Sequence, residues 1–548
     1  MQTRTWLRIL LPGSVLMVPV CLLFLSIDKS YAIPAFSRQY QTSCTTCHLD
    51  FPKLNDFGKA FKDAGFKFPK DDENFLKIAP TLLGAEAQKQ VWPKTVWPGQ
   101  IPGMPPIGLR MNNFFQMTGS NRNQFNSLAA PGTLPQVIPG TDFETGFFSI
   151  FTAGNFGSDI AFWVDDDISV AGANANGGLG DGYLRFVNIG RFLKLPKDAL
   201  TVRVGQFELD LPFTQARNIN LSPYDIYSES NVGAISSVLP LSQNVNNLFT
   251  FATAAKGVEV SGGHTYGGYH YSVAVLDQNT SGLSQTSSPY VPSATGGANG
   301  GVGFASDSTF KDVYARFSYR FNLERNAESR NGIQAAGATG PRDHTYLNFG
   351  TFYLNGKSQQ GLVGALPNGN PQLLYAREPY YRAGGDFSFN YRTFNLFGVY
   401  MVGHDNNLLP VDSKGDLIPL PLGSTTVPVG FVTSVPAKFN GGFLEADYLV
   451  LPWIMAIGRW DGVHSSADRI NGLAFNTGTS YFGPVNSERD RFTPGIQFLI
   501  HPNIKASFEY QFRPKQSVLV VTDPVTGNQQ AVNPFRVNTA LIGLEFVY

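Results

Sequence analysis

Two cysteines and a histidine near the N-terminus carry the clearest chemistry in the sequence. The stretch Cys44-Thr45-Thr46-Cys47-His48 separates two thiols by two residues and places an imidazole directly after the second thiol. This is the spacing of c-type haem attachment, in which the thiols bind the porphyrin through thioether bonds and the histidine is the proximal iron ligand. The pattern predicts one covalent haem c, bound by Cys44 and Cys47, with His48 as its metal ligand.

Other uses of this motif fit the sequence less well. A zinc site needs about four ligands, and the remaining cysteine of the chain, Cys21, lies in a segment that we expect to be removed. A disulfide between Cys44 and Cys47 would leave His48 without a role. A redox CxxC motif belongs to a βαβ pattern, which the surrounding sequence does not show.

A second axial ligand is needed if the iron only transfers electrons. Met104, in a loop rich in Pro and Gly, is our first candidate, because Met/His ligation favours reduced iron and raises its potential. The alternatives are Met111 or Met117, or a histidine in a strand turn such as His264 or His501. An open sixth position is the remaining possibility, and it would permit peroxidase-like chemistry.

The first 32 residues have the layout of a secretory signal peptide. Arg4 and Arg8 precede a long apolar run, and Ser30-Tyr31-Ala32 supplies a cleavage site. Removal of residues 1–32 would leave the haem cysteines as the thiols of the mature chain. Export before haem attachment fits an oxidising compartment that faces the periplasm.

The composition of the remaining chain is typical of a transmembrane β-barrel. The 548 residues include 57 Gly, 44 Phe and 22 Tyr, and the charged side chains, 15% of the total, balance formally. The mean hydropathy of −0.10 excludes an α-helical membrane bundle, whereas a barrel averages its lipid-facing and lumen-facing residues. No basic run predicts nucleic-acid binding.

Alternation with a period of two residues marks the strands. In residues 504–513, apolar Ile504 and Phe508 fall on one face and charged Lys505 and Glu509 on the other, which suits a wall between lipid and water. We count roughly sixteen strand candidates, an even number as in bacterial barrels. They lie near 110–118, 145–154, 158–166, 182–190, 200–207, 248–261, 266–276, 311–322, 345–354, 380–390, 393–402, 440–449, 453–460, 490–500, 504–513 and 535–548.

Short and long connections alternate between these strands, as periplasmic turns and extracellular loops do in such barrels. The sequence therefore predicts a mainly β protein with three parts. These are the signal peptide 1–32, a small α-helical haem segment with its linker at 33–106, and an antiparallel, porin-like barrel at 107–548. We expect the haem segment to plug or cap the barrel from the periplasmic side, with a helix within 50–68 and an extended linker at 69–100.

Several short motifs around the haem cysteines carry a family resemblance. They are Ala35-Phe36-Ser37-Arg38-Gln39, Cys44-Thr45-Thr46-Cys47-His48, Pro52-Lys53-Leu54-Asn55, Phe57-Gly58-Lys59-Ala60-Phe61-Lys62 and Gly65-Phe66. Together they resemble the N-terminus of the fused monohaem cytochrome c–porin family, which includes outer-membrane iron-oxidising cytochromes. Phe66 departs from the family pattern, in which a tyrosine is expected.

The resemblance implies an outer-membrane protein of a Gram-negative bacterium that takes electrons from extracellular Fe(II) and passes them to a periplasmic cytochrome c. In that family the matching cysteines carry the haem and the matching histidine is the proximal ligand. Two other functions remain open on the sequence. The chain could be a transport porin with a haem-containing structural plug, or a peroxidase-like haem enzyme.

Overall fold

The structure is a computed structural model, and most of the predicted haem segment and barrel is described in it. The described residues are 35–50, 52–68, 72–78, 81–82, 86–91, 100–101, 107–123, 139–157, 159–167, 178–214, 219–228, 251, 254–277, 311–323, 345–365, 371–411, 427–428, 431–467, 490–513, 519–522, 529–532 and 537–548. The predicted signal peptide lies outside them.

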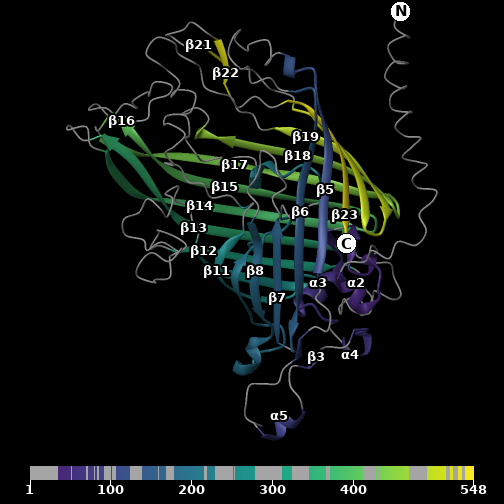
Figure 1. Cartoon of the computed structure of the whole chain (residues 1–548). Helices are drawn as coiled ribbons and strands as arrows, with labels where there is room; N and C mark the ends of the chain where they lie inside the picture. Colours follow the sequence, from purple (N-terminus) through teal and green to yellow (C-terminus); the bar gives the residue numbers. More distant parts are fainter. Residues whose placement is uncertain are drawn as a thin grey trace, which may run out of the picture.

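A closed antiparallel β-barrel dominates the described chain (Figure 1). Sixteen described strands form its wall, and the last strand pairs with the first to close it. The two-residue β16 (Val427–Pro428) adds a short parallel pairing to β13. The wall strands are β5 (Ile107–Thr118), β6 (Thr141–Phe156), β7 (Ile160–Asp167), β8 (Gly178–Phe186), β9 (Thr201–Phe207), β10 (Ala255–Gly263), β11 (Gly268–Asp277), β12 (Asp312–Asn322), β13 (Tyr346–Ala365), β14 (Pro371–Tyr391), β15 (Phe394–Val411), β17 (Phe431–Leu451), β18 (Ile454–Ser465), β19 (Arg491–His501), β20 (Ile504–Gln511) and β23 (Thr539–Val547).

The predicted barrel and its strand number are confirmed, and each strand candidate overlaps one strand of the wall. Strands β13, β14, β15 and β17 run much further than the sequence pattern indicated, and Figure 1 shows them extending beyond their neighbours. Their outer halves still pair in register, for example from Asn355↔Tyr381 to Ala365↔Pro371. Cross-strand pairing therefore continues where the alternation in the sequence fades.

The two faces of the wall differ sharply in polarity. Along β12, Phe317 is 50% exposed on the outer face, whereas Arg316 is 7% exposed on the inner face. On β23, Leu544 is 48% exposed and Glu545 is 4% exposed. The predicted assignment of apolar and charged residues to opposite faces of the strands is thus confirmed, with the charged residues turned inward.

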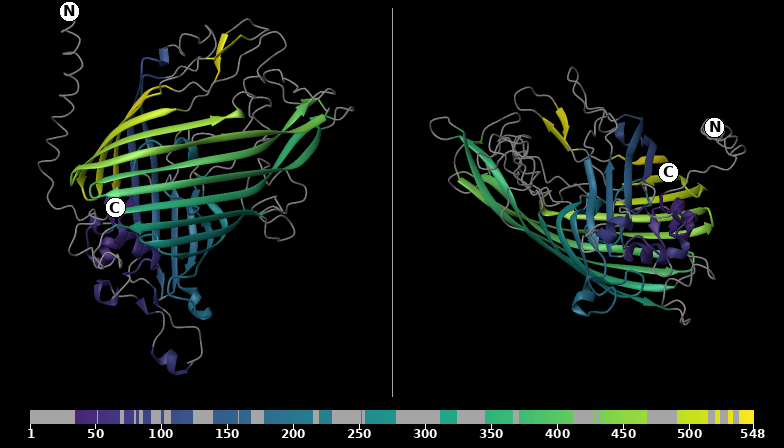
Figure 2. Two further views of the ribbon diagram at one scale, coloured as in Figure 1. Left: turned by 180° about the vertical axis from the view of Figure 1, so that it is seen from behind. Right: turned by 60° about the horizontal axis from the view of Figure 1, so that its bottom comes forward.

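The N-terminal segment is built from short elements at one end of the barrel. Helices α2 (Ala35–Tyr40) and α3 (Asp56–Asp63) lie near the C-terminus (Figures 1 and 2). Between them come the 3-10 helix η1 (Cys44–Thr46) and the hairpin of β1 (His48–Asp50) and β2 (Lys53–Leu54). The backbone of Tyr548 at the C-terminus pairs with that of Leu109 at the start of the first wall strand.

The expected extended linker at 69–100 is wrong where the structure describes it. This part contains helices α4 (Asp72–Phe75) and α5 (Glu86–Val91), and β3 (Thr81–Leu82) pairs with β4 (Gln100–Ile101). Tyr40 donates a hydrogen bond to Asp72 at 2.7 Å, so α4 folds back against the haem segment. Among the described residues, no helix has the length and hydropathy needed to cross a membrane.

A second element fills the lumen from the other end. We call residues 208–214 and 219–228, which lie between β9 and β10, the lumenal insert; it carries the short helix α7 (Asp225–Ser228). Its rings pack on the inner wall, with Tyr224 stacked on Phe443 at 3.8 Å and Phe213 at 4.3 Å from Phe397. The lumen therefore contains a hydrophobic core between insert and wall.

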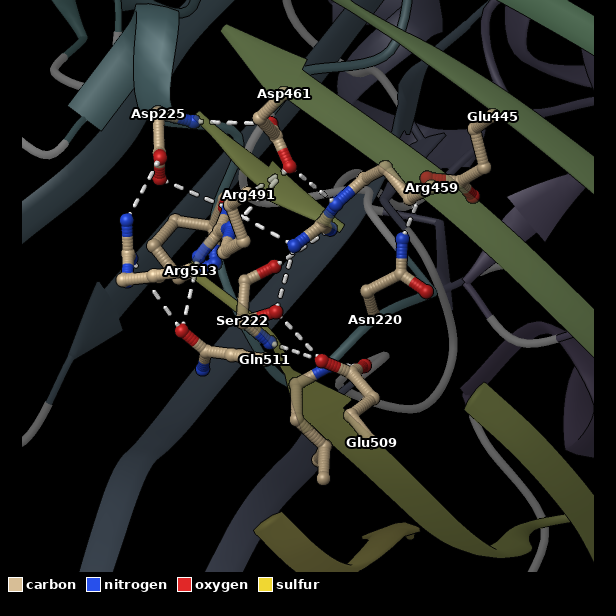
Figure 3. Close-up of polar contacts among 12 residues, drawn as sticks. Asn220, Ser222, Asp225, Glu445, Arg459, Asp461, Arg491, Glu509, Gln511 and Arg513 are labelled. Atoms are coloured by element: carbon tan, nitrogen blue, oxygen red, sulfur yellow. Dashed lines mark hydrogen bonds and ion pairs between the residues drawn. The ribbon is translucent and has the colours of Figure 1, made fainter. Parts of the chain in front are cut away.

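Buried charges fix this insert to the wall (Figure 3). Asp225 forms ion pairs with Arg491 at 2.8 Å and with Arg513 at 3.5 Å, and Arg491 also pairs with Asp461 at 3.1 Å. The Ser222 hydroxyl accepts a hydrogen bond from Arg459 at 2.6 Å and donates one to Glu509 at 2.5 Å. The side chains of Asp225 and Arg491 are fully buried, so their charges depend on these ion pairs for compensation.

We predict that Asp225→Asn loosens the insert. Removing one partner of a buried pair leaves an uncompensated charge and costs about 3–5 kcal/mol. The protein in detergent should unfold at a lower temperature, and protease should cleave the insert faster. Asp142→Asn removes the same charge from an exposed position and is the control. Equal melting of Asp225→Asn and wild type would contradict the role of the network.

Candidate functional site

The predicted haem-binding residues lie on one compact turn. Ser43 precedes η1, and the backbone N–H of Cys47 donates to the Cys44 carbonyl at 3.2 Å, so both cysteines belong to a single turn. His48 follows as the first residue of the β1–β2 hairpin. The two thiols are not joined in a disulfide. The turn thus presents two free thiols and an imidazole from one short segment.

The surroundings of the two thiols do not favour the thiolate form. Burial raises the pKa of Cys47 to about 12, and burial also raises that of Cys44. Reactive CxxC dithiols have the opposite property, a lowered pKa that supplies thiolate at neutral pH. The surroundings of this turn therefore argue against a dithiol oxidoreductase.

His48 has the hydrogen bond that a metal-binding histidine needs. Its Nδ1 lies 3.2 Å from the carbonyl oxygen of Pro52. With Nδ1–H as donor, the lone pair is on Nε2, and ring orientation by a backbone carbonyl is common for histidines that bind metals. Loss of solvation lowers the pKa of His48 to about 4, so its imidazole is neutral at physiological pH. Both features fit a proximal haem ligand.

Asn55 ties this turn to helix α3. Its side-chain oxygen accepts from the N–H of Gly58 at 2.8 Å, which caps the helix. Its side-chain nitrogen donates to the carbonyls of Thr45 and Thr46 at 3.3 and 3.0 Å, and its backbone N–H donates to Cys47 at 2.9 Å. The sequence shows Asn55 at the start of a helical pattern, but its hold on the cysteine turn appears only in the structure.

Gly58 allows the helix to touch the cysteine turn. A Cβ atom at this position would lie 2.2 Å from the carbonyl oxygen of Cys47. A glycine in this helix can also let the helix pack closely against a bound porphyrin. The structure gives it a nearer neighbour, because the backbone of the haem motif itself occupies that space.

An aromatic cluster joins the segment to the barrel wall. Phe36 stacks on Phe66 with centroids 5.5 Å apart, and Tyr40 stacks on Phe68 at 4.3 Å. Phe66 in turn lies 5.7 Å from Trp163 of β7. Phe66 is 4% exposed, so a tyrosine hydroxyl at this position would need a hydrogen-bond partner in the cluster. The departure from the family pattern is therefore compatible with this packing.

Charged contacts hold the segment against inward-facing residues of the barrel. Asp56 accepts two hydrogen bonds from Arg320 of β12 at 2.7 and 2.6 Å. Lys53 donates to Asp447 of β17 at 2.7 Å and to Asn395 of β15 at 2.9 Å. On another part of the wall, Arg185 of β8 donates to the carbonyl of Lys62 at 2.8 Å. The segment therefore sits inside the mouth of the barrel, at the end with the tight turns.

The candidates for the second axial ligand lie in different parts of the protein. Met104 lies outside the described residues. Met111 and Met117 stand opposite Phe546 and Ala540 on the outer face of the wall, so a role of either as an inward ligand is wrong. His501 lies at the β19–β20 turn with Nδ1 3.1 Å from Asn503, and His264 lies in the β10–β11 turn. Among the described residues, no group of three or more metal-ligating side chains is present.

No protein-family model and no curated protein matches the chain. Solved barrels that are similar to it include Salmonella typhi OmpF, with a TM-score of 0.40 and 10% identity, covering 81% of this chain and 97% of that chain. Vibrio cholerae OmpT has a TM-score of 0.38 and 7% sequence identity, and the match covers 85% of this chain and 100% of OmpT. A mutant of Rh. blastica porin has a TM-score of 0.34 and 10% sequence identity, and the match covers 81% of this chain and 100% of the porin. The barrel assignment rests on the strand pairing of this chain itself.

We predict that Asn55→Ala destabilises the cysteine turn. The substitution removes the helix cap, worth about 0.5–2 kcal/mol, together with both bonds to the turn. Hydrogen exchange at the amides of residues 44–48 should become faster. Asn406→Ala, which removes an exposed side-chain bond on a wall strand, is the control. Unchanged exchange in Asn55→Ala would show that the turn holds its shape without this side chain.

Proposed function

We propose that this protein is an outer-membrane electron conduit of the fused monohaem cytochrome c–porin type. It would take electrons from an extracellular donor through one c-type haem and pass them to a periplasmic cytochrome c. The observation that carries the proposal is the position of the haem motif. The turn from Cys44 to His48 belongs to a segment bound by ion pairs inside the mouth of a closed barrel.

The residues of the turn fit a covalent haem. Cys44 and Cys47 would bind the porphyrin, His48 would bind the iron, and Asn55 would keep the turn in shape. The haem would supply one-electron exchange between Fe(III) and Fe(II). Met104 remains our proposal for the sixth ligand.

The outer face of the barrel supports an outer-membrane location. It carries apolar and aromatic side chains, among them Phe317, Phe349, Tyr400 and Leu544, each 48% exposed or more. Charged side chains turn inward, which is the arrangement of a barrel that has lipid outside. Both described ends of the chain lie at the mouth with the tight turns, which in bacterial barrels faces the periplasm.

The contents of the lumen support a conduit more than an open pore. The haem segment occupies one mouth, and the lumenal insert packs its rings against the wall further in. A donor such as Fe(II) fits this design, because its insoluble product Fe(III) would form outside the cell. The electron would then cross the membrane without passage of the metal ion.

A transport porin with a haem-containing plug is the second candidate. The porin-like barrel favours it as much as it favours the conduit, because the fold alone does not set the function. The two differ in a measurable property, since a porin conducts solutes and ions through its lumen. A peroxidase-like enzyme, the third possibility, requires an iron with an open coordination position.

The deciding experiment is stopped-flow spectroscopy of the purified protein in detergent. Oxidised protein is mixed with Fe(II), and the haem bands are followed. We expect a low-spin, six-coordinate haem that is reduced rapidly. The double variant Cys44→Ser, Cys47→Ser should lose covalent haem while the barrel still forms. Cys21→Ser is the matched control, because Cys21 lies in the predicted signal peptide.

Each other result points elsewhere. A low-spin haem that only other donors reduce would keep the conduit and exclude Fe(II). A high-spin haem that reacts rapidly with peroxide would favour the enzyme. Solute conductance in planar bilayers, unchanged when the haem is lost, would favour the porin. A purified protein without covalent haem would overturn the proposal.

The proposed location gives a prediction for the outer face. Phe317→Arg places a charge in the middle of β12 and should cost about 2–4 kcal/mol in a bilayer, because charge on the lipid face is least favourable at the midplane. Leu323→Arg, just beyond the end of the strand, should cost about 1 kcal/mol or less. Urea titration in lipid vesicles measures both. Equal costs would contradict the membrane orientation.

A further inference from the structure

A cavity of about 320 Å³ lies between the haem segment, the lumenal insert and the inner wall. Lys53 and Lys59 line it from the haem segment, Thr214 from the insert, and Arg203 and His270 from the wall. The volume is within the usual range for pockets that bind small molecules. Cys44, Cys47 and His48 are not part of its lining, but Leu49 and Pro52 are, so the cavity adjoins the predicted haem site.

Two side chains in this cavity have donors without acceptors. Arg203 is 8% exposed, and it donates to Glu259 at 2.6 Å and to the carbonyl of Glu208 at 3.0 Å, but its Nε has no partner. Thr214 is also 8% exposed, and its hydroxyl has no partner. A buried donor without an acceptor is unfavourable, because it has lost its hydrogen bonds to water. Both residues line the same cavity.

The neighbouring charges limit what this occupant can be. The lining contains seven lysine and arginine side chains and four carboxylates. Three of the cations are paired with carboxylates outside the lining: Arg316 with Asp386, Arg320 with Asp56, and Lys53 with Asp447. The cavity is therefore close to neutral overall, and Glu208 adds a carboxylate to the same lining. A cation finds no unshared carboxylate cluster here.

We propose that this cavity binds a small oxyanion, a carboxylate or a phosphate, through Arg203 and Thr214. His270 faces the same space with an Nδ1 that has no partner, while its Nε2 is held by Asp210 at 2.8 Å. The haem segment supplies Lys59 and Lys62 as a further wall, so the anion would touch the segment and the barrel together. The site requires neither the haem nor electron transfer.

Isothermal titration calorimetry of the full-length protein in detergent tests the proposal with two probes, inorganic phosphate and succinate. We expect saturable binding of at least one of them, and the difference between the probes identifies the class of anion. Thr214→Val should weaken binding by about tenfold, because a hydrogen bond to a charged group contributes about 1.5–3 kcal/mol. Arg203→Gln should weaken it at least as much.

A matched control distinguishes the loss of a binding contact from the general effect of removing a buried hydroxyl group. Thr493 on β19 is 2% exposed and also has an unpartnered hydroxyl, but it does not line the cavity. Thr493→Val should leave anion binding unchanged. Arg203→Gln also removes the ion-pair partner of the buried Glu259 and can therefore prevent folding. In that case Thr214→Val is the decisive variant.

Three results would overturn the inference. The first is no saturable binding of either anion, which means that the cavity holds water. The second is binding that Thr214→Val leaves unchanged. The third is equal weakening by Thr214→Val and Thr493→Val. None of these results depends on haem spectra, so the conduit proposal is tested separately.

Discussion

Charges buried inside the barrel need partners of opposite sign, and this need decides where the haem segment and the lumenal insert lie. The inner wall carries arginines, lysines and carboxylates that are almost fully buried, and a buried charge is tolerated only when it is paired. Some pairs form between strands, as Arg316 does with Asp386. Others need partners from outside the wall. Asp56 of the haem segment and Asp225 of the insert meet that need, which fixes both elements in the lumen.

This arrangement links the fold to the proposed chemistry. The cysteine turn owes its shape to local bonds from Asn55, but its place in the barrel depends on Lys53 and Asp56, which pair with wall strands β17 and β12. A flexible tether would leave a bound haem at a variable distance from both sides of the membrane. Ion pairs to separate strands hold the segment in one position, as an electron carrier requires. A rigid plug in a porin would need the same contacts, so solute conductance, and not these contacts, separates the two functions.

Local patterns explain which parts of the fold were predictable. Strand positions follow from alternation with a period of two, because each residue of a barrel wall faces either lipid or lumen. The predicted strands were shorter than the observed β13, β14, β15 and β17. The additional halves of these strands, far from the tight turns, mix Gly, Pro and polar residues and are held by pairing with neighbouring strands. It was wrong for α4 and α5, where short helical turns interrupt a segment that looked extended.

From the sequence alone come the predicted haem motif, which is a prediction still, and the barrel class, the strand number and the inward direction of the charges, which the structure confirms. Each of these depends on residue types at short spacing. Tertiary structure decided which charges meet, such as Arg320 with Asp56, and it created the cavity at Arg203 and Thr214. The physical reason is that closing the barrel brings together residues hundreds of positions apart. Many lumenal carboxylates are equivalent in sequence, and only the closed wall selects the partner of each arginine.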